Sequence, residues 1–372
     1  MTASNEQRKI RYAVVGLGWI SQVAVLPAFA NAENSELVAL ISDDPTKREE
    51  LSRKYGVQQT YSYAEYDRCL KSGEVDAVYI GLPNHLHREY TVRAAQAGVH
   101  VLCEKPMAVT EQDCEAMIAA CRDNNVKLMI AYRLHFEPAN MQAVEIIKSG
   151  QIGEPRFFSS VFTQQVEEAN VRVKKNLGGG VLDDMGIYCI NAARYLFQDE
   201  PIEVFAVSAS KPESRFQEVA EMHSVILRFP EDRLATFTCS FGTAPVANYQ
   251  IVGTKGDLRL DPGYGFQGAL THYLTINGKT QEQTFPPTDQ FAAELIYFAE
   301  CILQNQDPEP SGVEGLNDIR IIRALDRSIE IGSPVKLGKL EKQQHPSAAQ
   351  IIQRPPIQEP ELIHAADPSG KS

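Results

Sequence analysis

The chain has 372 residues, seven cysteines without a CxxC pair and a net charge of −12. The negative charge argues against nucleic acids and anionic membranes as partners, because both bind clustered cations, and the cysteine spacing argues against a zinc site or a disulfide framework. A chain longer than about 300 residues predicts two domains, and without an export signal or a membrane-spanning run it is expected in the cytoplasm.

Residues 1–132 alternate short apolar strands with helical segments. The strands are expected at residues 10–17, 36–42, 77–83, 100–106 and 127–133, and the helices at 45–56, 87–98 and 110–125. Strands that are apolar throughout are typical of a parallel sheet with helices on both faces. The pattern predicts an N-terminal α/β domain over residues 1–132.

Longer strands with alternating polarity follow. They are expected at residues 154–164, 223–241 and 249–262, with helices at 181–197 and 288–305. Alternation is typical of a sheet with one covered face, so residues 133–337 are predicted to form an α+β domain with a large, open, mostly antiparallel sheet. Residues 338–372 are rich in Gln and Pro, which predicts a flexible extension, although residues 351–363 could dock on a neighbouring surface.

The segment GLGWIS follows the first strand and opens a helix. Gly16 permits a tight turn, and Gly18 lets the backbone approach a pyrophosphate, which the N–H groups at the helix start would bind. Ser21 stands where a third glycine is usual, and Trp19 and Ile20 lie within the turn. After an apolar strand, this segment predicts a dinucleotide site; the alternative is a glycine turn without a ligand.

The end of the second strand bears on which dinucleotide binds. An acid there bonds the ribose hydroxyls of NAD, whereas a small residue with a nearby cation suits the 2′-phosphate of NADP. Ser42 and Lys47 favour NADP, and Asp43 favours NAD. These residues leave the choice open, and Lys47 has a second interpretation as part of a solvated helix face.

The segment GGGVLDDMGIY places Asp184 and Tyr188 on one helical face after three glycines. Residues four apart on a helix are neighbours, so a carboxylate and a phenol presented together could handle a proton. The alternative is that Asp184 stabilises the helix dipole and Tyr188 belongs to the core. The helix considered alone favours that alternative.

Four motifs occur in order along the chain, namely GLGWIS, GLPNHLH, HVLCEKPMAVT and GGGVLDDMGIY. With them, residues 8–337 resemble the Gfo/Idh/MocA oxidoreductases, and most closely the glucose–fructose oxidoreductase branch of NADP-dependent sugar dehydrogenases. The resemblance implies a Rossmann domain followed by a substrate domain whose open sheet serves oligomerisation, as a homo-dimer or homo-tetramer. It implies hydride transfer between NADP, or NAD, and a sugar or related polyol. Dehydrogenation of a cyclitol or dihydrodiol, and a non-catalytic dinucleotide sensor, are the alternatives.

The resemblance also implies roles for single residues. Lys105 matches the lysine of the family's EKP motif, near the nicotinamide and the substrate, and Asp184 and Tyr188 match its D-x-x-x-H/Y pair. Further positions on the cofactor side are Leu82, Asn84, His87, Glu104, Arg133 and Arg172. This sequence departs from the family in two places. Val171 replaces the family's tryptophan directly before Arg172. Asp43 stands where the branch has glycine, which weakens the inference to NADP.

An active role for Lys105 follows from these matches. Removing the proton of a sugar hydroxyl while hydride leaves requires a base, and a tyrosine with its reference pKa of about 10 is a poor base at neutral pH. A nearby ammonium favours the phenolate. We therefore expect Lys105 and Tyr188 to act on the substrate hydroxyl, and Asp184 to orient the lysine or another hydroxyl of the sugar.

Overall fold

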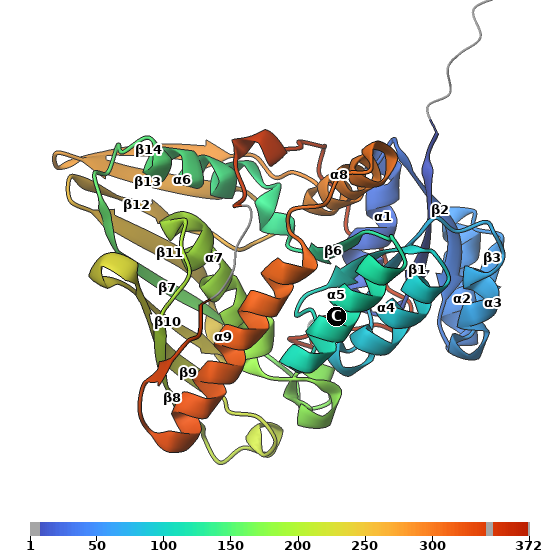
Figure 1. Ribbon diagram of the computed structural model, residues 1–372, viewed down its shortest axis with the longest axis horizontal. Helices are drawn as coiled ribbons and strands as arrows, with labels where there is room; N and C mark the ends of the chain where they lie inside the picture. Colours follow the sequence, from blue (N-terminus) through green and yellow to red (C-terminus); the bar gives the residue numbers. More distant parts are fainter. Residues whose placement is uncertain (1–7, 340–344, 371–372) are drawn as a thin grey trace, which may run out of the picture.

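The computed structural model describes residues 8–339 and 345–370, and it consists of a six-stranded sheet and a nine-stranded sheet with their helices (Figure 1). The first sheet is parallel and of the Rossmann type, and the second is mixed and mostly antiparallel. The predicted fold class is therefore confirmed. The boundaries at residues 132 and 337 stay a prediction, because one helix crosses between the two halves.

The N-terminal sheet has the strand order β3-β2-β1-β4-β5-β6. Its strands are β1 (Ile10–Val15), β2 (Ser35–Ile41), β3 (Gln59–Tyr61), β4 (Ala77–Ile80), β5 (His100–Glu104) and β6 (Leu128–Ala131). The helices of this half are α1 (Leu26–Ala28), α2 (Pro45–Tyr55), α3 (Tyr66–Leu70), α4 (His87–Gln96) and α5 (Glu111–Asp123). All predicted strands of this half form. β3 and α3 were not predicted from the sequence, because elements this short give no periodic pattern.

Successive side chains of β1 enter different cores, because strand side chains alternate between the two faces of a sheet. Ala13 and Val15 join the core under α3, α4 and α5, whereas Tyr12 and Val14 join the core under α1 and α8 (Gln290–Gln304). α8 comes from the second half of the sequence, yet it packs beside α1 on the N-terminal sheet (Figure 1). The two halves of the chain are therefore fastened to each other.

The second sheet has the strand order β14-β13-β12-β11-β7-β10-β9-β8-β15, and only β7 and β10 pair in parallel. Its strands are β7 (Pro155–Gln165), β8 (Glu203–Ala209), β9 (Met222–Phe229), β10 (Arg233–Ser240), β11 (Gly242–Gly253), β12 (Gly256–Leu260), β13 (Leu270–Ile276), β14 (Lys279–Phe285) and β15 (Val335–Lys336). Helices α6 (Pro138–Lys148), α7 (Ile187–Phe197) and α9 (Gly312–Ile331) contact it.

Within the described residues, one face of this sheet carries no helix. Along β9, buried and exposed residues alternate, as expected for a strand with one covered face. Several large apolar side chains are exposed on the other face: Phe157, Val207, Ile226 and Leu234. The register of β7, β8, β9 and β10 places them on the same side of the sheet.

The long helix α9 is absent from the helices predicted from the sequence. Gly312 and Gly315 at its start disfavour a helix, but the fold needs glycine here. A Cβ added at Gly315 would lie 2.8 Å from the Cβ of Met107, in the loop after β5. Buried Ile319 and Ile322 then pack the rest of the helix into the core.

The C-terminal segment that begins at residue 345 lies against the protein, which corrects the expectation of a flexible extension. The backbone N–H of Asp289 donates to Arg354 O over 3.0 Å, and the N–H of Ile363 donates to the side chain of Gln22 over 2.8 Å. Apolar side chains of the segment pack against the core beneath α8. The alternative given for residues 351–363, docking on a neighbouring surface, agrees with these contacts, although the prolines and glutamines around the apolar residues favoured a flexible extension.

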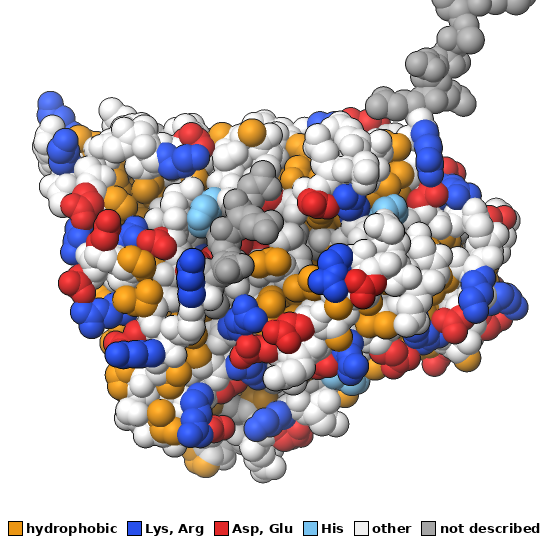
Figure 2. All heavy atoms as spheres, viewed as in Figure 1, with side chains coloured by type: hydrophobic (Ala, Val, Ile, Leu, Met, Phe, Trp, Pro, Cys, Tyr) orange, Lys and Arg blue, Asp and Glu red, His pale blue; other side chains and the backbone are white. Residues whose placement is uncertain are grey.

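No helix in the described part of the chain is long and apolar enough to cross a bilayer. All seven cysteines are buried and unpaired, as the spacing predicts. Figure 2 shows Lys and Arg interspersed with Asp and Glu over the face it draws, without the continuous positive surface that nucleic acids bind.

Candidate active site

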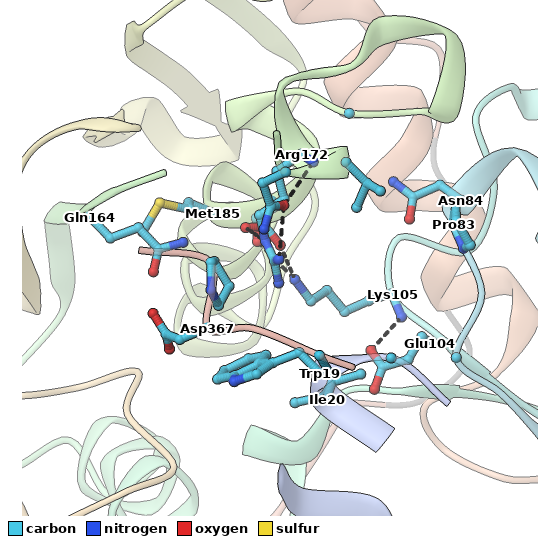
Figure 3. A pocket seen from close by; sticks show the side chains of 18 of the residues that line it. Trp19, Ile20, Pro83, Asn84, Glu104, Lys105, Gln164, Arg172, Met185 and Asp367 are labelled. Atoms are coloured by element: carbon cyan, nitrogen blue, oxygen red, sulfur yellow. Dashed lines mark hydrogen bonds and ion pairs between the residues drawn. The ribbon is translucent and has the colours of Figure 1, made fainter. Parts of the chain in front are cut away.

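A cavity of about 780 Å³ opens at the carboxyl ends of β1, β4 and β5. Its other walls come from β7, from the loop before α7 and from the C-terminal segment (Figure 3). Open parallel sheets bind ligands at the carboxyl ends of their strands, and the volume is within the range of small-molecule and cofactor sites.

The turn after β1 has the shape of a phosphate-binding loop. Gly16 has φ of +89°, and a Cβ there would lie 2.7 Å from the carbonyl oxygen of Gly81. A Cβ at Gly18 would meet only open space, so this backbone is accessible from the cavity. Ser21 donates a hydrogen bond of 2.6 Å to Gly16 O, which shows how a serine serves in place of the third glycine. The residues present therefore fit a dinucleotide, whose pyrophosphate this turn would hold.

The end of β2 differs from the sequence-based expectation. The Asp43 carboxylate accepts the backbone N–H of Tyr63 over 2.8 Å, and Ser42 is buried with its hydroxyl accepting the N–H of Asp44. Neither Asp43 nor Ser42 lines the cavity, whereas Lys47 does. The short strand β3 causes this arrangement, because it ends beside Asp43 and leads to the N–H that the carboxylate bonds.

Lys105 and Asp184 meet across the cavity, one from each half of the chain. Lys105 Nζ donates to Asp184 Oδ1 over 3.0 Å and to Asp184 O over 2.9 Å, and Arg172 Nε donates to the other carboxylate oxygen over 2.7 Å (Figure 3). The carboxylate is thus held between two cations. The glycines at residues 178–180 allow this, because a Cβ at Gly179 would lie 2.5 Å from Arg172 O.

The charges of this cluster stabilise one another. Burial raises the pKa of Asp184, but Arg172 and Lys105 outweigh burial and hold that pKa well below its usual range. Burial lowers the pKa of Lys105, but Asp184, Tyr188 and Glu104 outweigh it and leave the pKa above its usual value. The ammonium and the carboxylate therefore both stay charged from mildly acidic to mildly alkaline pH.

Tyr188 lies beside this ion pair, one helical turn after Asp184. Lys105 Nζ is 4.6 Å from the centre of the Tyr188 ring, and the Arg133 guanidinium is 5.0 Å from it. The ring of Phe162 packs edge-on against it at 5.4 Å. Tyr188 is therefore held among two cations and an aromatic ring, and it lines the cavity.

The helix that carries Tyr188 is fixed by a buried ionic network. Arg194 on α7 is fully buried, and its guanidinium bonds Glu314 and Asp318 of α9 and Glu200 after α7. The distances are 2.9 Å, 2.6 Å and 2.6 Å. A buried cation with three carboxylate partners locks the rotation of α7, and with it the direction of Tyr188.

Hydrogen bonds of Glu104 and His87 fix the position of the EKP loop. Glu104 accepts the hydroxyl of Tyr79 and the N–H of Lys105, and burial raises the pKa of Glu104. His87 is fully buried, and its ring nitrogens lie 3.0 Å from Pro106 O and 2.8 Å from Leu82 O. His87 therefore supports the loop from the core side, which corrects its expected place on the cofactor side.

Most of the residues singled out from the sequence do come together. The ones that line the cavity are Gly18, Trp19, Ile20, Lys47, Leu82, Asn84, Glu104, Lys105, Arg133, Arg172, Asp184 and Tyr188. Gly16, Ser42, Asp43 and His87 do not line it. Sequence reasoning missed the lining residues Tyr264, Phe266 and residues 364–368, and no motif marks them.

A phosphate-binding turn, a lysine–aspartate pair and a tyrosine around one cavity define a two-domain nicotinamide-dinucleotide oxidoreductase. Residues 10–132 match the family described as "Oxidoreductase family, NAD-binding Rossmann fold", and residues 140–259 match the "GFO/IDH/MocA C-terminal domain". The chain belongs to the Gfo/Idh/MocA family and is an NAD(P)-dependent oxidoreductase. The resemblance read from its motifs is confirmed.

Named relatives extend over nearly the whole chain. A D-xylose 1-dehydrogenase [NADP(+)] of Haloarcula marismortui is 33% identical over 88% of this chain and 93% of its own length. The crystal structure of an aldose-aldose oxidoreductase from Caulobacter crescentus, complexed with glycerol, has a TM-score of 0.85 and 39% identity, over 89% of this chain and all of that one. A 3-ketoreductase from Actinomadura kijaniata, in complex with NADP and TDP-benzene, has a TM-score of 0.79 and 26% identity, over 87% of this chain and 98% of that one.

Proposed function

We propose that this protein transfers hydride between NADP and a sugar, an aldose or a related polyol, with Lys105, Tyr188 and Asp184 as the groups that act on the substrate. The observation that carries the proposal is the placement of the Lys105 ammonium against both the Asp184 carboxylate and the Tyr188 ring in one cavity. Relatives named as a D-xylose dehydrogenase and an aldose-aldose oxidoreductase support a sugar as the substrate.

Each side chain has a separate task in this proposal. The nicotinamide ring of the bound dinucleotide supplies the hydride acceptor or donor. Tyr188 takes the proton of the substrate hydroxyl as general base, and the Lys105 ammonium stabilises the negative charge that develops on that oxygen. Asp184 keeps Lys105 charged and directed into the cavity, and Arg172 keeps Asp184 ionised.

The remaining assignments belong to the same proposal. The dinucleotide would be held by the cavity residues of the glycine turn, by Leu82, Asn84 and Glu104, and by Arg133 and Arg172. Residues 133–337 would supply the substrate side of the site, and the described residues contain no cluster of His, Cys, Asp and Glu side chains that could hold a metal ion. A cytoplasmic location stays a prediction.

A substrate panel tests the proposal. The protein is incubated with NADP or NAD and with aldoses, inositols and a dihydrodiol, and nicotinamide absorbance reports turnover. We expect reduction of the dinucleotide with one or more aldoses. Turnover restricted to inositols or dihydrodiols would contradict the sugar assignment, and dinucleotide binding without any turnover would favour a sensor.

The cofactor preference is predicted to depend on Lys47. Lys47 lines the cavity, whereas the competing Asp43 carboxylate is bonded to the Tyr63 N–H. A single cation near a partly exposed phosphate contributes about 1 kcal/mol. Lys47→Ala should therefore lower the ratio of kcat/KM for NADP to that for NAD by about fivefold.

Asp43→Gly serves as the comparison for this ratio. Because the Asp43 carboxylate is directed to Tyr63, this substitution should change the ratio by less than about twofold. A large shift towards NADP in Asp43→Gly would show that the carboxylate does face the ribose. An unchanged ratio in Lys47→Ala would remove Lys47 from the phosphate site.

The open sheet is predicted to associate with a second copy of the chain, as a homo-dimer or homo-tetramer. Val207 and Ile226, about half exposed at 53% and 44%, lie on the uncovered face, and large apolar surfaces of this kind mark interfaces. Light scattering should give a multiple of the chain mass, and Val207→Glu with Ile226→Glu should reduce it to the monomer. Ile331→Glu, at an equally exposed position at the end of α9, should not. A monomeric wild-type protein would contradict the prediction.

A further inference from the structure

The final residues of the described chain run along the cofactor cavity. Residues 361–370, here called the strap, follow an outer stretch in which Pro355 O accepts the side chain of Asn31 and Arg354 pairs with Glu33. The outer stretch thus fastens the segment to the N-terminal half before it reaches the cavity. The strap itself contains neither helix nor strand.

A buried glutamine clamps the start of the strap. Gln22 is 1% exposed, its Nε2 donates to Ile363 O over 2.8 Å, and its Oε1 accepts the N–H of Ile363 over 2.8 Å. The same Nε2 donates to Leu17 O over 2.9 Å, inside the phosphate-binding turn. The strap is therefore attached to the turn that would hold the pyrophosphate.

Two further contacts hold the strap in place along the cavity. His364 Nδ1 lies 2.9 Å from the Asp44 carboxylate, which also accepts the N–H of Lys47 at the start of α2. At the other end, Pro368 O accepts the N–H of Glu167 over 3.0 Å. Glu167 follows β7 in the second half of the chain, so the strap joins the two halves.

The strap also forms part of the cavity wall. Residues 364–368 and Gly370 line the cavity together with Trp19, Lys47 and Arg172. In the view of Figure 3, Asp367 lies between Gln164 and Trp19, and the backbone of the segment passes between the two halves of the protein. The cavity is thus lined by a segment that is held at both ends.

We propose that the strap encloses the bound dinucleotide and has to detach before the dinucleotide leaves. The proposal rests on the dinucleotide site of the proposed function, and it makes residues 361–370 a further part of that site. Segments held by a few hydrogen bonds and without regular secondary structure open more readily than the core. Opening of the strap, and not the contacts of the glycine turn alone, then sets the rate at which the dinucleotide is released.

The test compares the full-length protein with a chain that ends at Pro360. Each protein is saturated with NADPH, mixed rapidly with excess NADP, and followed by nicotinamide fluorescence, without substrate. The truncated chain should release NADPH about tenfold faster or more, because affinity changes within one site appear mainly in the dissociation rate. Its association rate should not fall.

A point variant covers the case in which the truncated chain does not fold. Ile363→Pro keeps the whole chain but removes the N–H that Gln22 accepts, and it should also release NADPH faster. Arg354→Ala is the matched control, because it removes the ion pair of the outer stretch with Glu33 and a hydrogen bond to Gln353 O, both outside the strap. It should release NADPH at the rate of the full-length protein.

The possible outcomes separate this proposal from the proposed function. Equal release rates in the full-length, truncated and Ile363→Pro proteins would overturn the strap alone. Tighter NADPH binding by the truncated chain would show that the segment competes with the dinucleotide, and would also overturn it. A full-length protein that binds no NADPH would contradict the proposed function itself.

Discussion

Lys105→Ala is expected to lower kcat by about a hundredfold or more, which is the scale of acid–base assistance. The substitution removes the ammonium that pairs with the Asp184 carboxylate. The same ammonium is the positive charge that lies 4.6 Å from the centre of the Tyr188 ring. Dinucleotide affinity should change little, because the glycine turn and Lys47 are untouched. Turnover measured beside NADPH titration by fluorescence separates the two effects.

Lys127→Ala is the matched control for this variant. Lys127 is buried to nearly the same degree, with side-chain exposure of 15% against 12% for Lys105, and it also forms an ion pair, with Asp307. It lies outside the cavity. Wild-type turnover in Lys127→Ala and in Lys105→Ala alike would remove Lys105 from the reaction.

Tyr188→Phe is expected to lower kcat by about a hundredfold or more, because it removes the hydroxyl that takes the substrate proton. Phenylalanine keeps the ring that packs at 5.4 Å against Phe162, so the loss reports the hydroxyl and not the packing. Turnover should therefore fall, and NADPH titration by fluorescence should show an unchanged affinity for the dinucleotide.

Tyr195→Phe controls for the loss of a buried hydroxyl on the same helix. Its hydroxyl donates to Asn140 over 3.0 Å, so the substitution should cost about 1 kcal/mol of stability without lowering kcat. Turnover near that of the wild type in Tyr188→Phe would assign the base to another group.

The sequence could predict the residues whose roles depend on local pattern. Gly16 and Gly18 follow a strand, so motif and position together were enough to predict the turn. Asp184 and Tyr188 lie one helical turn apart, but the helix alone favoured a structural role for them, and the family resemblance was needed to propose that they act together. The resemblance then added Lys105, which spacing alone could not place beside Asp184 because the two residues are far apart in the chain.

The misplaced residues depend on contacts that no local pattern contains. Asp43 turns away from the cavity because β3, only three residues long, ends beside it. His87 is buried because the EKP loop folds back over it. The helix α9 begins with glycines because Gly312 lies close to Ile118 and Gly315 lies close to Met107.

The C-terminal segment concealed its role for a similar reason. Its composition is typical of a flexible extension, and the clamp that holds it, Gln22, is a polar residue without any motif. Only the folded chain brings Gln22 and Ile363 within 2.8 Å. The composition of a segment indicates whether the segment can form a core of its own. It does not indicate whether the segment packs against the core of another part of the chain.

Hydride transfer from a sugar carbon at this site is tested most directly by isotope transfer. The protein is incubated with NADP and D-xylose or another accepted aldose deuterated at C1, then denatured to release all dinucleotide for mass spectrometry. We predict NADPH that carries the deuterium, and its loss in Lys105→Ala. Reduced dinucleotide without deuterium, or no reduction with any sugar of the panel, would contradict the account.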